Sequence, residues 1–192
     1  FIDLRADFPA VRSMSVEKKV LIVIAPVKFR DEELSEPIKY LEKAGIGYDI
    51  ISTQTGLAIG MLGGKVLIEK TVRDVSEAGI TPYAGILIVG GGGSPDHLWN
   101  NKPLQTLVQE FDAAGKILSA ICLSTVVLAQ AGVLKGKQAT VWNDDAAIHQ
   151  LRQGGATYKP DPIVSDGRVI TANGPPAAAG FGEKVAKAVL AA

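Results

Sequence analysis

The stretch Ile117-Leu118-Ser119-Ala120-Ile121-Cys122-Leu123-Ser124 decides the fold and contains the single cysteine of the chain. Its first five residues form an apolar run that predicts a buried strand. The sequence from Ser124 to Ala131 predicts a helix, which Gly132 terminates. Cys122 therefore stands where a strand turns sharply into a helix, and the same device presents the nucleophile in many hydrolases.

Strands and helices alternate on both sides of this stretch. Further apolar runs predict strands at 19–24, 48–52, 86–89 and 139–142. Amphipathic segments predict helices at 33–44, 103–114, 145–153 and 182–192. Asp166-Gly167 marks a hairpin between 163–165 and 168–171, whereas the glycine-rich segment 53–82 indicates only turns or a small hairpin. The pattern predicts the α/β class: a doubly wound, mostly parallel sheet with helices on both faces, as in a flavodoxin-like three-layer sandwich.

Composition excludes several classes of protein. Lysine plus arginine and aspartate plus glutamate both number 20, so electrostatics gives no reason to expect a nucleic acid or an anionic membrane as partner. One cysteine cannot form an internal disulfide, and a reducing compartment follows, so we expect a cytoplasmic protein. One cysteine and two histidines cannot make a His/Cys zinc site. We expect neither a metal nor a cofactor.

Length predicts one domain over residues 18–192. We expect residues 1–17 to be an N-terminal tail or leader segment, because Met14 stands just before the first predicted strand. Because the formal net charge is zero, electrostatic repulsion between copies of the chain is weak, which fits a homo-oligomer.

Cys122 is the candidate nucleophile. A thiol at the start of a helix faces free backbone N–H groups and the positive end of the helix dipole, and both lower its pKa. The thiolate is the reactive form of cysteine. The alternative interpretation is an inert cysteine packed in the apolar core.

The run Gly90-Gly91-Gly92-Gly93 directly follows the strand predicted at 86–89. It lacks the spacing of a dinucleotide-binding or P-loop motif, so a phosphate cradle is a poor interpretation. Such a run can bring bare N–H groups toward a neighbouring strand end, as an oxyanion hole requires. The alternative is a plain flexible turn.

The acidic run Asp31-Glu32-Glu33, with Glu36, opens the first predicted helix. Such runs commonly compensate the helix dipole, but one carboxylate could instead turn inward and bond the thiol. The sequence does not select which carboxylate does so.

The chain has two histidines, and a Cys-His pair would need one of them beside Cys122. His97, which follows the glycine run, is the better candidate. The other histidine lies in the helix predicted at 145–153 and is expected on the surface.

Four segments occur in an order that is typical of one superfamily. They are the acidic segment 29–37, the glycine loop 89–96, the cysteine turn 120–122 with the helix leading to 131–136, and the hairpin 166–175. From about residue 18 to residue 190 the sequence thereby resembles the DJ-1/PfpI (ThiJ/PfpI) superfamily, which is class I glutamine amidotransferase-like.

The resemblance implies roles for particular residues. Glu33, four residues before a proline, matches the glutamate that hydrogen-bonds the cysteine in this superfamily, and in protonated form it would stabilise the thiolate. The N–H groups of Gly92 and Leu123 match the oxyanion hole. Members are commonly homodimers or higher homo-oligomers, and in PfpI-type assemblies an acid at the position of Asp96 comes from a neighbouring subunit.

The departures from the superfamily concern its histidines. PfpI-type proteases carry histidine directly after the cysteine, where this chain has Leu123. DJ-1 carries one further downstream, where this chain has Trp142 or Asn143. Both usual bases are therefore missing, which counts against a peptidase because a leaving amine must be protonated.

Three functions follow, in this order. The first is a cysteine-dependent enzyme (a hydrolase, glyoxalase or deglycase) that acts on small carbonyl compounds through Cys122 and Glu33. The second function, ranked only slightly lower, is a redox-sensing stress-response protein in which an oxidant converts Cys122 to a sulfenic or sulfinic acid. An intracellular cysteine peptidase comes third. The expected partners are a small carbonyl substrate or an oxidant, and further copies of the chain.

Overall fold

Six strands within residues 18–192, the part of the chain that the computed structural model describes, form the central sheet in the order β10-β11-β7-β6-β1-β3. Their bounds are β1 Lys19–Val23, β3 Gly47–Ile51, β6 Tyr83–Ile88, β7 Ile117–Ile121, β10 Ile163–Asp166 and β11 Val169–Ala172. All neighbours pair in parallel except β10, which pairs antiparallel with β11. The tail or leader predicted for residues 1–17 lies outside the described residues.

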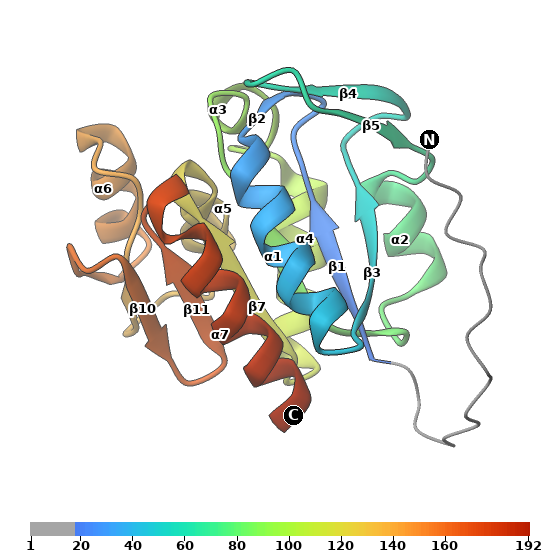
Figure 1. Ribbon diagram of the computed structural model, residues 1–192. Coiled ribbons are helices and arrows are strands. Elements are labelled where there is room, and N and C mark those ends of the chain that lie inside the picture. Colours follow the sequence, from blue (N-terminus) through green and yellow to red (C-terminus); the bar gives the residue numbers. More distant parts are fainter. Residues whose placement is uncertain (1–17) are drawn as a thin grey trace.

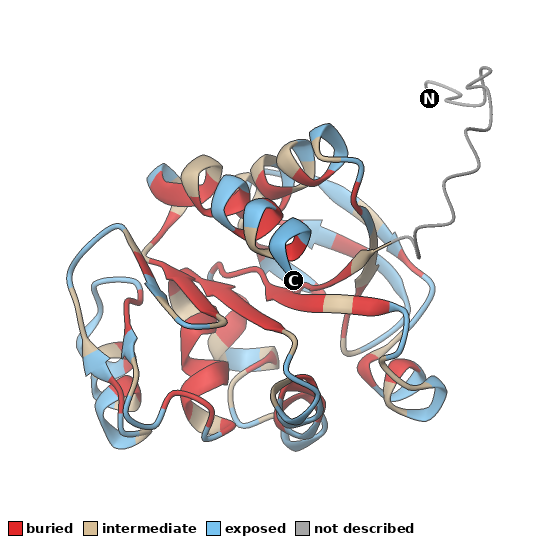
Figure 2. Cartoon of the chain, turned by 90° about the horizontal axis from the view of Figure 1, so that it is seen from below, coloured by how far each residue is buried: buried red, intermediate tan, exposed pale blue. Residues whose placement is uncertain are grey.

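Helices cover both faces of this sheet, as Figure 1 shows. On one face α1 (Asp31–Lys43) and α7 (Ala178–Ala191) lie side by side, and on the other lie α2 (Val72–Ala78), α4 (Lys102–Ala113) and α5 (Thr125–Gln130), with α6 (Asp145–Gln153) packed outside α5. Successive residues of β1 alternate between the two cores, because strand side chains point to opposite faces. Figure 2 shows the result as a buried sheet between helices whose outer faces are exposed. The predicted three-layer α/β fold is confirmed.

The segment 53–82 holds structure that the sequence analysis resolved only in part. The small hairpin is present as β4 (Gly56–Gly60) and β5 (Lys65–Ile68), which join β2 (Val27–Phe29) in a separate sheet. Helix α2 was missed, although Thr71 and Asp74 form a capping box at its start. The strand predicted at 139–142 shrinks to β8 (Gln138–Ala139), which pairs with β9 (Thr157–Tyr158) away from the central sheet.

Pro37 lies in the interior of α1 rather than in its first turn. Its ring carries no N–H, so the carbonyl of Glu33 lacks its helical partner. Pro37 is buried and faces Gly182 of α7, where an added Cβ would come within 2.6 Å of the Pro37 Cα atom. The close approach of these two helices therefore requires glycine at position 182. No helix within the described residues is both long and apolar enough to cross a membrane.

We predict that Gly182→Ala lowers the free energy of unfolding by about 1 to 2 kcal/mol, because the clash with the α1 backbone outweighs the gain in helix propensity. Chemical denaturation measures the change. Gly180→Ala is the matched control: its Cβ would meet only the flexible end of Ile163, so it should leave stability unchanged or raise it. Equal stability of the two variants would contradict this packing.

Candidate functional site

Three segments converge at the carboxyl ends of the neighbouring strands β1, β6 and β7. They are the β2–α1 connection, the glycine run after β6, and the turn 122–124 after β7. Backbone hydrogen bonds join the first two: the Arg30 N–H donates to the Gly90 carbonyl at 2.9 Å, and the Gly93 N–H donates to the Lys28 carbonyl at 3.1 Å. Ligand sites of doubly wound sheets form at this edge. The three segments singled out from the sequence thus meet in one place.

The glycine run is tightly packed against the β2–α1 connection. A Cβ at Gly91 would collide with the backbone of Arg30, and one at Gly93 with the carbonyl of Val27. Gly91 also has φ +116°, which side chains rarely allow. The run is therefore neither a flexible turn nor an open phosphate cradle.

Cys122 occupies a strained turn between β7 and the short 3-10 helix Cys122–Ser124. Its φ is +60°, a left-handed conformation that costs a non-glycine residue on the order of 1–3 kcal/mol. Hydrogen bonds fix the two peptides that follow it, because the Trp142 N–H donates to the Cys122 carbonyl at 3.3 Å and the Trp99 indole donates to the Leu123 carbonyl at 2.8 Å. The predicted nucleophile-elbow geometry is thus present.

Ser124 ties the cysteine turn to the glycine run. Its Oγ donates to the Val89 carbonyl at 2.6 Å and lies 2.8 Å from the Ser94 Oγ. Both serines are completely buried. Ser124 is the N-cap residue of α5, but its side chain makes no capping hydrogen bond, so the serine pair instead holds the two loops together.

Glu33 is the acid of its run that turns inward. Its side chain is fully buried, and a Cβ on Gly90 would lie 2.6 Å from its Oε1 and 2.7 Å from the Cys122 Cβ. Gly90 therefore leaves the space in which the carboxyl and the thiol face each other. Neither Glu33 oxygen has a partner of good hydrogen-bond geometry among residues 18–192, and its polar neighbours are the Cys122 thiol and the Gly90 amide.

The other members of the acidic run have different tasks. Asp31 accepts hydrogen bonds from the Leu62 and Gly64 amides at 2.7 and 2.8 Å, so it holds the β4–β5 turn. Glu32 forms a two-pronged ion pair with Arg30, at 2.7 and 2.9 Å. These contacts show that Asp31 and Glu32 do more than compensate the helix dipole from an exposed position.

Burial sets the protonation of both reactive groups. It raises the pKa of Glu33 to about 8, so this carboxyl is protonated at neutral pH. Burial, with a contribution from ionised Glu33, raises the pKa of Cys122 to about 12, although the Leu123 and Gly91 amides act in the opposite direction. The Leu123 amide at the helix start lowers the thiol pKa, as expected, but desolvation of the thiolate outweighs it, so the net shift is upward rather than downward. Once Glu33 is protonated, its repulsive contribution disappears.

A small cavity of about 190 Å³ opens onto the thiol. It is lined by Arg30, Met61, Gly91, Gly92, Cys122, Leu123, Trp142 and Pro175. Gly92 and Leu123, to which the resemblance assigns the oxyanion hole, both line this cavity, but the Gly92 N–H donates to the Met61 Sδ at 3.3 Å. Sequence reasoning did not find Met61, because its turn lies far from the cysteine along the chain.

No histidine lines this cavity within the described part of the chain. Asp96 is exposed and His97 is half-buried in the four-residue helix α3 (Ser94–His97), and neither reaches the cavity. His149 is exposed on α6, as expected. Trp142, at a position where the superfamily suggested a histidine, forms part of the wall instead.

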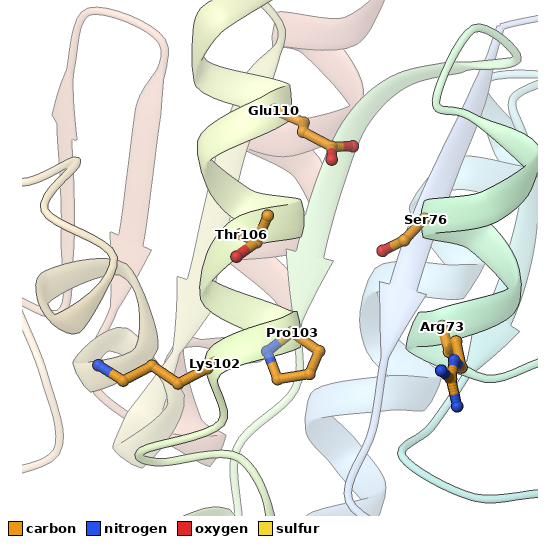
Figure 3. A pocket seen from close by; sticks show the side chains of 6 residues that line it. All are labelled: Arg73, Ser76, Lys102, Pro103, Thr106 and Glu110. Atoms are coloured by element: carbon orange, nitrogen blue, oxygen red, sulfur yellow. The ribbon is translucent and has the colours of Figure 1, made fainter.

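A larger cavity of about 640 Å³ lies between α2 and α4. Figure 3 shows the Lys102 side chain directed away from α2. None of its lining residues is a buried charge, a cysteine or a histidine. Size alone therefore does not identify the reactive site.

The chain is similar in sequence to several known proteins. The chain is 52% identical over 171 residues to an uncharacterized protein of Methanocaldococcus jannaschii, covering 89% of this chain and 82% of that one. It is 29% identical to a Bacillus subtilis protein named provisionally as a cysteine protease, and 28% identical to protein/nucleic acid deglycase 2 of Escherichia coli. Each match covers 83% of this chain and 91% of the relative.

Among solved structures, a ThiJ/PfpI domain protein from Brachyspira murdochii superimposes with a TM-score of 0.84 at 30% identity, covering 91% of this chain and 97% of that one. The model of the DJ-1/PfpI family matches residues 18–188. The chain belongs to the DJ-1/PfpI family.

Proposed function

We propose that this protein is a cysteine-dependent enzyme that converts small reactive carbonyl compounds, with 2-oxoaldehydes such as methylglyoxal as the substrate class. The observation that carries the proposal is the fully buried Glu33 carboxyl, which faces the Cys122 thiol at the wall of a cavity of only about 190 Å³. Burial favours the protonated form of this carboxyl. A relative named protein/nucleic acid deglycase 2 also favours an enzyme.

A protonated carboxyl can relay a proton without creating charge. One oxygen of Glu33 accepts the proton of the Cys122 thiol while the hydroxyl of the same group delivers its own proton toward the substrate oxygen. The S–C bond forms, the carbonyl π bond opens, and the product is a neutral hemithioacetal. Because no net charge develops in the buried site, the high pKa of the thiol is compatible with reaction. The C1 hydrogen of the hemithioacetal then moves as a proton to the former ketone carbon, and the C1 hydroxyl proton moves to the ketone oxygen, which gives a thioester of the 2-hydroxy acid on Cys122. Water adds to the thioester carbonyl, the C–S bond breaks, and the 2-hydroxy acid leaves while the sulfur regains its proton.

The two other functions find less support in the same site. Oxidation of cysteine proceeds through the thiolate, and burial leaves little thiolate on Cys122 at neutral pH. Peptide cleavage needs a group that protonates the leaving amine, and no histidine lines the cavity within residues 18–192. Addition of the thiol to an aldehyde expels no leaving group, so this step needs no group that protonates a leaving amine. A cytoplasmic location belongs to the proposal, since the chemistry needs a free thiol.

We predict that Cys122→Ala abolishes conversion of methylglyoxal to lactate, and that Glu33→Gln lowers kcat/KM about 10²- to 10⁴-fold because the proton relay is lost. Enzymatic lactate measurement follows both. His97→Gln should retain wild-type turnover. Turnover that survives Cys122→Ala, or that depends on His97, would refute the proposed chemistry.

Stability should also report the protonation of Glu33. Its pKa rises from the ordinary 4.5 to about 8 on folding, so its contribution to stability is fully present below pH 4.5 and is lost as the pH rises through 8. The unfolding free energy of the wild type should therefore fall relative to that of Glu33→Gln across this interval, by on the order of a few kcal/mol. A constant difference between the two proteins from pH 4.5 to 8 would show that Glu33 is ionised at neutral pH.

Self-association is a further part of the proposal. The outer face of the small sheet carries exposed apolar side chains, and strand pairing places them side by side: Val27 opposite Ile59, and Leu57 opposite Leu67. Leu57 and Leu67 are 55% and 66% exposed. Adjacent exposed apolar side chains of this kind commonly mark an interface, and a second copy of the chain is the partner we propose.

We predict that the protein sediments as a dimer or larger assembly and that Leu67→Glu shifts it toward the monomer, because a charge would be buried in the interface. Leu190→Glu is the matched control, since Leu190 is 55% exposed near the end of α7, away from this sheet. Sedimentation velocity distinguishes the species. A monomeric wild type, or the same shift in both variants, would rule out this surface.

A further inference from the structure

We propose that Met61 is a gate whose side chain covers the Gly92 amide and limits the size of the carbonyl compounds that reach Cys122. The inference rests on the proposed function, because it concerns the admission of the same substrates to the same thiol. It makes Met61 a residue that determines specificity, at a position that the sequence analysis did not connect with the site.

The contact between Met61 and Gly92 is the first observation. The Met61 Sδ accepts the Gly92 N–H at 3.3 Å, and both residues line the cavity at the thiol. A Cβ added to Gly92 would have only the end of the Met61 side chain within 4 Å, with Cε at 3.8 Å and Sδ at 4.0 Å. The thioether is thus the group that covers this amide.

The backbone around Met61 is anchored, which is the second observation. The Met61 N–H donates to the Phe29 carbonyl at 2.8 Å, and the next residues, Leu62 and Gly64, donate to the Asp31 carboxylate. These bonds fasten the β4–β5 turn to the start of the helix that carries Glu33. The turn is therefore held in place, while the unbranched Met61 side chain, 46% exposed, can change rotamer about its own bonds.

The chemistry of the contact favours displacement by substrate. A thioether sulfur is a weak hydrogen-bond acceptor, whereas a carbonyl oxygen is a stronger one. The Gly92 amide thus has a partner at rest and exchanges it for the reacting oxygen. With Met61 at one wall and Trp142 at another, the cavity of about 190 Å³ leaves little room beside the thiol, so large substituents are excluded.

The test compares how fast Cys122, the single cysteine, is alkylated by a small reagent, iodoacetamide, and by a bulky one, N-phenylmaleimide, at one pH. Met61→Ala should raise the bulky-to-small rate ratio about tenfold, the effect of a few missing methylene-sized groups in a pocket. Met61→Phe should lower the ratio, which keeps the test decisive if the alanine variant folds poorly. Leu62→Ala, at the same turn but outside the cavity, should keep the wild-type ratio. Wild-type ratios in both Met61 variants would overturn the gate.

Turnover separates the gate from the function on which it rests. Met61→Ala should raise kcat/KM for 4-methyl-2-oxopentanal relative to methylglyoxal, mainly through a lower KM for the larger aldehyde. If the wild type converts neither aldehyde while the alkylation ratio shifts, the gate is supported and the proposed function fails. If methylglyoxal is converted and the ratio does not shift, the gate is overturned and the function stands.

Discussion

The opposition of a buried carboxyl and a buried thiol across Gly90 is the constraint on which the rest of the site depends. Glu33 is fully buried, and its carboxyl has no partner of good geometry within residues 18–192, so its charged form is costly there. The protonated form persists to about pH 8 as a result. A side chain at position 90 would fill the space between carboxyl and thiol, and glycine is what permits their approach. The left-handed backbone conformation of Cys122 adds strain at the same site. The apolar packing on both faces of the sheet offsets the free energy of this strain and of burying the Glu33 carboxyl.

This constraint explains why the missing histidines matter less than they do for peptide cleavage. A histidine base would create an ion pair, which needs a polar and partly solvated site. Here the wall is formed by apolar groups of Met61, Trp142 and Pro175, with Arg30 neutralised by Glu32. Such surroundings favour a reaction in which protons move between neutral groups. Addition of a thiol to a reactive aldehyde is a reaction of that kind.

Much of the fold could be predicted from the sequence, because β-branched runs and helix stops are local signals. The turn at Cys122 followed from one strand and one helix that adjoin in the chain. The choice of Glu33 from its acidic run was different: local pattern left it open, and only the resemblance to a family selected it. That side chain turns inward because the start of α1 lies against the glycine run after β6 and the cysteine turn after β7, which is a property of the tertiary structure.

Three features escaped sequence reasoning for physical reasons. The direction of the Cys122 pKa shift depends on burial, which outweighs the helix-start effect that the sequence suggested. Met61 reaches Gly92 through a turn that Asp31 holds in place, a contact between residues far apart in the chain. The segment 139–142 has the composition of a strand, yet the edge position beside β11 is taken by β10, so only a two-residue pair forms.

The most direct test of this account is the pKa of Glu33 itself. Carbon-13 NMR of the side-chain carboxyl groups in glutamate-labelled protein, with Glu33→Gln to assign the signal, follows its titration. The account predicts one carboxyl that is protonated at neutral pH and titrates near pH 8, as burial beside the thiol requires. A Glu33 signal that titrates near the ordinary value of 4.5 would mean a charged carboxylate beside Cys122 and would contradict the neutral proton relay.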